Sequence, residues 1–131
     1  MITILFQTES HFPVDAQAIK DAISRNLEAR VQGDTEVSVS IVGDRRMKAL
    51  NSLYRKLEKT TDVLSFPQND PSQPMAPFVP VPDGVMRLGD IVVSYPQAVV
   101  EAAEENMLVL DKIIELTLHG LEHLLGNHHE E

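Results

Sequence analysis

The chain of 131 residues contains no cysteine. It can form neither a disulfide framework nor a thiolate metal site, which fits a reducing cytoplasm. Its first residues, Met1 to Phe6, lack the basic start and long apolar run of a signal peptide. No uninterrupted apolar run is long enough to span a membrane. We expect a soluble cytoplasmic protein without a membrane partner, and the length favours a single domain over residues 1–131.

Basic residues are scarce and unevenly placed. The chain has 11 lysines and arginines against 20 acidic residues, and this net charge of −9, taken alone, argues against a nucleic-acid partner. A local positive field can still attract a polyanion to an acidic protein. Six of the basic side chains, called the basic cluster below, lie together within residues 44–59: Arg45, Arg46, Lys48, Arg55, Lys56 and Lys59. They are candidates for substrate binding, and the alternative is an ordinary solvated helix face.

Hydrophobic periodicity predicts an alternation of strands and helices. The predicted strands are residues 2–8, 36–42, 61–66 and 87–94. The predicted helices begin at residues that cap or open helices, namely Asp15, Asp44, Pro96 and Asp111, and the first ends at about Val31. A proline-rich loop occupies residues 67–86. This order predicts an α+β domain with a four-stranded mixed sheet and helices packed on it. The last helix is apolar nearly all round and should be buried.

Four of the five histidines lie within residues 119–129. His119 and His123 are four apart, so on a helix they share one face, with Cβ atoms about 5–6 Å apart. Gly126 can end that helix in the left-handed conformation, and the turn can bring His129 back toward the same point. Three imidazoles and one open position are the arrangement of a catalytic zinc site.

We therefore predict one divalent ion, zinc first, bound by His119, His123 and His129. Imidazole also suits nickel, copper and iron. His128 competes with His129 as the third ligand, although the spacing favours His129. The alternative is a helix with surface histidines near the chain terminus.

Four motifs carry a resemblance. They are Asn51-Ser52-Leu53-Tyr54-Arg55, Thr61-Asp62-Val63-Leu64-Ser65-Phe66-Pro67, Leu88-Gly89-Asp90-Ile91, and His119-Gly120 with His123 and His129. From about Leu50 onward the sequence resembles the YbeY family of bacterial metal-dependent endoribonucleases. It departs from the family pattern at Glu122, Asn127 and His128.

The resemblance implies zinc on the three histidines and an arginine, Arg55, that is needed for activity. Arg55 and His119 are then the expected catalytic residues, and we expect the basic helix to face the same cleft as the metal. The implied substrate is single-stranded RNA rather than DNA, in 16S ribosomal RNA 3′-end maturation and ribosome quality control. The small ribosomal subunit and its associated proteins are the implied partners. From the residues alone, Arg55 could instead form a surface ion pair with Glu58.

Two other functions are open. Metzincin peptidases share the histidine spacing, but they carry a glutamate directly after the first histidine as general base. Gly120 stands at that place and cannot take a proton, and Glu122 lies about 60° around the helix from His119. A zinc metallopeptidase-like or other small-molecule hydrolase is therefore the first alternative. A non-catalytic ribosome-associated protein with a structural metal is the second.

Overall fold

The computed structural model describes residues 1–9, 11–55, 61–68 and 84–126, apart from the side chains of Tyr54 and Arg55. Within these ranges, four strands and four helices follow one another in the predicted order. The strands are β1 (Ile2–Thr8), β2 (Thr35–Val42), β3 (Val63–Pro67) and β4 (Met86–Ser94). The helices are α1 (Ala16–Glu28), α2 (Asp44–Arg55), α3 (Tyr95–Glu104) and α4 (Val109–Leu124). Most of the proline-rich loop lies outside the described residues.

The strands form one mixed sheet in the order β1-β2-β4-β3. The β1–β2 and β2–β4 pairs are parallel, whereas β3 runs antiparallel to β4 at the edge. The parallel register shifts between Glu36 and Val37, beside Gly89 on β4. Gly89 has a φ of +137°, and a Cβ atom there would lie 2.9 Å from the Cα of Pro67, so the close approach of β3 requires glycine. The expected single α+β domain with a four-stranded mixed sheet is confirmed.

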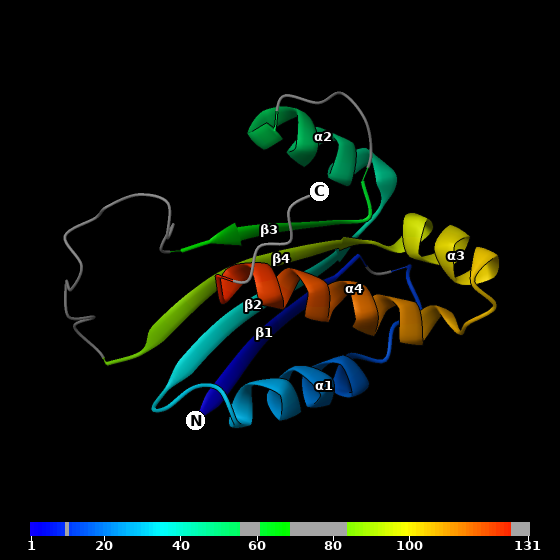
Figure 1. Cartoon of the computed structure of the whole chain (residues 1–131). Helices are drawn as coiled ribbons and strands as arrows, with labels where there is room; N and C mark the ends of the chain where they lie inside the picture. Colours follow the sequence, from blue (N-terminus) through cyan, green and yellow to red (C-terminus); the bar gives the residue numbers. More distant parts are fainter. Residues whose placement is uncertain (10, 56–60, 69–83, 127–131) are drawn as a thin grey trace.

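The two faces of the sheet carry different helices (Figure 1). On one face, alternate residues of the strands pack with α1, α3 and α4 into the larger core, which includes Ile91 and Val93 of β4 and Leu121 of α4. On the other face, Met47 of α2 packs with Val92 and its neighbours into a smaller core. The strand period of two residues sends Ile91 and Val92 to opposite faces. The two helices of interest, α2 and α4, therefore lie on opposite sides of the sheet.

Helix α4 is buried along most of its length, as its sequence predicts. Its start is not where the sequence placed it. The helix begins at Val109, and Leu108 precedes it without a side-chain cap, so Asp111 lies inside the first turn. The carboxylate of Asp111 still interacts favourably with the positive end of the helix dipole.

The other helix starts show what the sequence could and could not specify. Asp15 caps α1 as predicted, because Ala18 N donates to its Oδ1 at 3.1 Å, although α1 ends at Glu28 and not at Val31. Asp44 is the first residue of α2 rather than its cap. Pro96 lies in the first turn of α3, as predicted, and Ser94 caps this helix by accepting a hydrogen bond from Gln97 N at 3.2 Å. In the described part of the chain, no helix is long and apolar enough to cross a membrane.

Candidate functional site

The paired histidines lie on the last two turns of α4. The ring centroids of His119 and His123 are 4.7 Å apart, and the rings are inclined at 52°. Both side chains are half-buried, and the Nε2 atom of His123 is buried. The predicted pairing of these two imidazoles on one helix face is therefore present. A rigid, buried helix holds them, which fixes their mutual geometry.

The chain leaves α4 through Gly126, as predicted. Its φ is +91°, in the left-handed region, and its N–H donates to the carbonyl oxygen of His123 at 3.1 Å. His128 and His129 lie outside the described residues, so the third ligand stays a prediction. Among residues 1–9, 11–55, 61–68 and 84–126, no three His, Asp or Glu side chains gather to hold a metal ion.

Gly120 is a point of close contact between α4 and the sheet. A Cβ atom at this position would meet Cγ2 of Ile91 at 2.8 Å and Cγ2 of Val63 at 3.4 Å. The residue after the first histidine thus points into the sheet and away from solvent. Even a glutamate at this place could not serve as the general base of a peptidase, because the sheet occupies the space it would need.

Glu122 is held by a residue far away in the sequence. Arg30, just after α1, contacts both carboxylate oxygens of Glu122, and its Nη2 donates to Oε2 at 3.0 Å. This bidentate contact raises the pKa of Arg30, first through the hydrogen bond to Glu122. The Glu122 side chain therefore links α4 to the end of α1.

A groove of about 500 Å³ runs along α4 beside His119 and reaches the start of β3. Its most unusual member is Lys112, whose side chain is only 5% exposed. The Nζ atom lies 2.7 Å from Glu105, 3.1 Å from Glu115 and 3.8 Å from Glu101. The hydrogen bond to Glu105 contributes most to raising the pKa of Lys112, and the other carboxylates add to it. This buried cation ties α3 to α4.

The same groove contains a pair of carboxyl groups, Glu101 and Asp62. Burial, with the neighbouring charge and hydrogen bond of Asp62, raises the pKa of Glu101 to about 7, and Lys112 opposes the shift only in part. The sequence analysis missed Lys112 and Glu101. The available signal was the one lysine within an apolar helix, with Glu115 three residues further on.

The basic cluster lies elsewhere. Arg45, Arg46 and Lys48 are exposed on α2, while Lys56, Lys59 and the side chain of Arg55 lie outside the described residues. For the described part of α2, the prediction that this helix faces the histidines is wrong, because α2 and α4 pack on opposite faces of the sheet. Arg55 ends α2 on that other face, and its catalytic role stays a prediction.

A four-stranded mixed sheet covered by helices, with a buried last helix, is a fold that a solved structure shares. The solution structure of a protein from Thermotoga maritima aligns over 97% of this chain and 75% of its own, with a TM-score of 0.64 and 25% sequence identity. Both proteins have the same α+β architecture.

Sequence comparisons name the family within this class. The family model of the endoribonuclease YbeY matches residues 4–131. An endoribonuclease YbeY from Dehalococcoides mccartyi is 37% identical over 123 residues, or 90% of this chain and 77% of the relative. One from Moorella thermoacetica is 35% identical over 127 residues, or 93% and 80%. One from Roseiflexus castenholzii is 37% identical over 118 residues, or 89% and 72%. The chain belongs to the endoribonuclease YbeY family, which confirms the resemblance that its motifs carry.

Proposed function

We propose that this protein is a zinc-dependent endoribonuclease that cleaves single-stranded RNA, with the 3′ end of precursor 16S ribosomal RNA as its substrate. The observation that carries the proposal is its membership of an endoribonuclease family over nearly the whole chain. The site on α4 supports it, because the paired imidazoles suit a hydrolytic metal centre. Ribosome maturation and quality control would place the protein in the cytoplasm, with the small ribosomal subunit and its associated proteins as partners.

The residues present fit a metal ion with nitrogen ligands. His119 and His123 are neighbours on one helix face, with the Nε2 atom of His123 buried, and the turn at Gly126 leads toward His129. These three histidines would hold the ion, and protein groups would then leave one position open. A bound zinc ion would supply an activated water molecule and would polarise a phosphoryl oxygen.

The chain's arginines would handle the phosphate charge. Cleavage of a phosphodiester develops negative charge on the non-bridging oxygens, which a guanidinium stabilises with two parallel hydrogen bonds. We assign this role to Arg55. Arg45, Arg46 and Lys48 would attract the RNA from the exposed side of α2, together with Lys56 and Lys59. An acidic protein can bind a polyanion in this way, because the positive charges are concentrated on one helix.

Peptide hydrolysis is less well supported. Gly120 packs against Ile91, and Arg30 holds the carboxylate of Glu122, so neither position beside the histidines offers the general base of a zinc peptidase. A purely structural metal is also disfavoured, because structural zinc sites have four protein ligands.

Cleavage of a labelled single-stranded RNA tests the proposal. Wild-type protein should cleave it, and a chelator should stop the cleavage. His119→Ala should abolish cleavage and lower the zinc content measured by elemental analysis from about one ion per chain. Arg55→Ala should abolish cleavage while the zinc content is retained.

The matched control is His11→Ala, the same substitution at the histidine outside the motif. His11 lies near Glu9 and Phe12, far from α4 in the sequence, and its loss should leave both zinc content and cleavage unchanged. Equal cleavage by wild type, His119→Ala and Arg55→Ala would reveal a contaminating nuclease and refute the proposal. Hydrolysis of a peptide without cleavage of RNA would favour the peptidase.

A further inference from the structure

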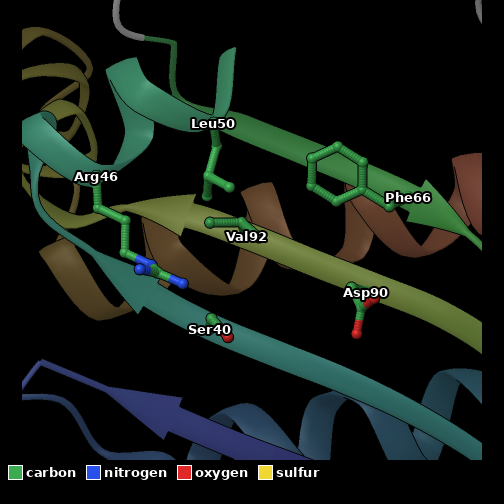
Figure 2. Close-up of a pocket in the computed structure, with 6 residues that line it drawn as sticks. All are labelled: Ser40, Arg46, Leu50, Phe66, Asp90 and Val92. Atoms are coloured by element: carbon green, nitrogen blue, oxygen red, sulfur yellow. The ribbon is translucent and has the colours of Figure 1, made fainter. Parts of the chain in front are cut away.

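A small pocket opens on the α2 side of the sheet, opposite the histidines (Figure 2). We call it the α2-face pocket, and its volume is about 270 Å³. Three of the residues that line it are apolar and three are polar. The apolar residues are Leu50, Phe66 and Val92, and the polar ones are Ser40, Arg46 and Asp90.

The strand register explains how these side chains come together. Ser40 of β2 is paired with Val92 of β4, and Phe66 of β3 is paired with Asp90 of β4. In an antiparallel pair such as Phe66 and Asp90, directly opposed residues have Cβ atoms about 4.5–5.5 Å apart on one face of the sheet. The register shift at Gly89 sets which residues of the Leu88–Ile91 motif face α2, and Asp90 is one of them. Phe66 and Asp90, one residue from each of two motifs found in the sequence, thus meet on the α2 face, while Val63 and Ile91 of the same motifs face Gly120 on α4.

Figure 2 shows Arg46 and Leu50 pointing from α2 toward the strands, with the guanidinium of Arg46 reaching toward β2 and Asp90 farther along β4. Arg46 and Asp90 are both exposed. In the described part of the chain, no salt bridge or side-chain hydrogen bond joins either of them to another residue. The pocket therefore presents a positive group at one end and an acceptor at the other, on either side of an apolar floor.

We propose that the α2-face pocket binds one unpaired guanine of an RNA strand, with Asp90 accepting hydrogen bonds from the base and Arg46 contacting an adjacent phosphate. This subsite rests on the proposed function, because it reads the RNA that the enzyme would cleave. Single-stranded RNA is recognised in this manner, by splayed bases that lie on apolar or aromatic side chains and are hydrogen-bonded at their edges.

Guanine fits the acceptor at Asp90 best. An ionised carboxylate can only accept hydrogen bonds, and it does so through two neighbouring oxygens. The Watson–Crick edge of guanine offers two adjacent donors, N1–H and the N2 amino group, which match those oxygens. Adenine and cytosine offer one amino group next to a ring acceptor, and uracil places its single donor between two carbonyl oxygens that a carboxylate repels.

The size of the pocket agrees with one base. Pockets for drug-sized ligands measure about 300–1,000 Å³, so this one lies just below that range. A second hollow of about 300 Å³ shares Ser40 and Arg46 with it and continues toward β1. Arg46 therefore stands between two spaces, where the phosphate that links a bound base to the next nucleotide would lie.

Binding of short oligouridylates, with and without one central guanine, tests the subsite. Fluorescence anisotropy in the presence of a chelator measures binding without cleavage. A bidentate contact to a base discriminates by about 1–3 kcal/mol, so the oligonucleotide with guanine should bind about 5- to 150-fold more tightly than the one with uridine alone. Asp90→Asn should remove this preference. Arg46→Gln should weaken all oligonucleotides alike and reduce the slope of log K against log salt by about 0.7.

Matched control variants carry the same charge changes on α1, on the opposite face of the sheet. Asp21→Asn and Arg25→Gln are both exposed and should leave the guanine preference and the affinities unchanged. Thermal melts of all four variants would show that each is folded. Amide shifts of Ser40 and Asp90 on adding guanosine monophosphate give a second measurement that needs no substitution.

Equal affinity for guanine-containing and uridine-only oligonucleotides would overturn the subsite. An effect of Asp90→Asn on binding to purified small ribosomal subunits, without an effect on oligonucleotides, would assign the pocket to a protein partner and also overturn it. The proposed function can fail while the subsite stands. If the protein prefers guanine through Asp90 but does not cleave RNA, the subsite is supported and the nuclease activity is refuted.

Discussion

Replacing Glu101 by glutamine should change how the stability of this protein depends on pH. In the folded protein, burial and Asp62 raise the pKa of Glu101 from 4.5 to about 7. Between these two values, the folded state binds a proton that the unfolded chain has lost. The free energy of unfolding therefore falls as the pH rises, since stability decreases with pH wherever the folded state holds more protons. The contribution is fully present below the unfolded pKa of 4.5 and is lost as the pH rises through 7.

The magnitude follows from the shift. One pKa unit corresponds to about 1.4 kcal/mol, so the shift from 4.5 to about 7 amounts to about 3 kcal/mol. Glutamine has the shape of the protonated carboxyl group and cannot ionise. Relative to wild type, Glu101→Gln should therefore gain about 3 kcal/mol of unfolding free energy between about pH 4 and pH 8, because only the wild type must then ionise the buried group.

Urea unfolding of both proteins at a series of pH values measures this difference, and titrating groups that do not interact with Glu101 cancel in the comparison. Glu104→Gln is the control, because Glu104 is exposed on the same helix, and its difference from wild type should not vary with pH. A flat difference for Glu101→Gln would show that the pKa of Glu101 is the same in the folded and unfolded protein and refute the reasoning. A difference that moves against the variant as the pH rises would mean that attraction by Lys112 outweighs burial.

Two further substitutions test the surroundings of the histidines. Glu122→Gln should leave the rate of RNA cleavage at equal zinc content unchanged, because Arg30 holds this carboxylate; a general base at Glu122 would instead cost about a hundredfold or more in rate. Gly120→Ala should lower the free energy of unfolding by up to about 2 kcal/mol in urea, since overpacking against Ile91 costs about 1–3 kcal/mol and better helix propensity returns about 1 kcal/mol. Ile91→Ala in the same chain should reduce that penalty, and a Gly120→Ala protein about 1 kcal/mol more stable than wild type, the full gain in helix propensity, would contradict the close approach.

Much of the fold could be predicted, because local patterns specify it. The alternation of Val37, Val39 and Ile41 gives β2, and the turn at Gly126 follows from a glycine after an apolar helix. The helix starts were harder, because distant groups satisfy some of them. The N–H of Gly43, before α2, donates to Glu9 at 3.1 Å, a residue 34 positions away. A contact of this kind leaves no local signal, so the local sequence favours Asp44 as the cap.

The candidate site was predictable only where one element carries it. His119 and His123 share a helix, and their spacing alone places them together. No such signal predicts the face of the sheet on which α2 lies. The handedness rule for crossovers applies to connections between parallel strands, whereas β3, the strand that follows α2, is antiparallel to its neighbour β4. The groups around Lys112 come from β3, α3 and α4, so only the folded chain brings them together.

The distribution of charge across the sheet has a consequence for the proposed nuclease. The groove beside His119 contains Lys112 among carboxylates that include Asp62, Glu101 and Glu115, so its field repels a phosphate chain. On the opposite face, α2 carries the exposed cations Arg45, Arg46 and Lys48. An RNA strand would therefore gain its affinity on the α2 side, and only the scissile phosphate would need to approach the histidines past the β3 edge. On this argument, Arg46→Gln should raise KM with little change in kcat, whereas His119→Ala should remove kcat.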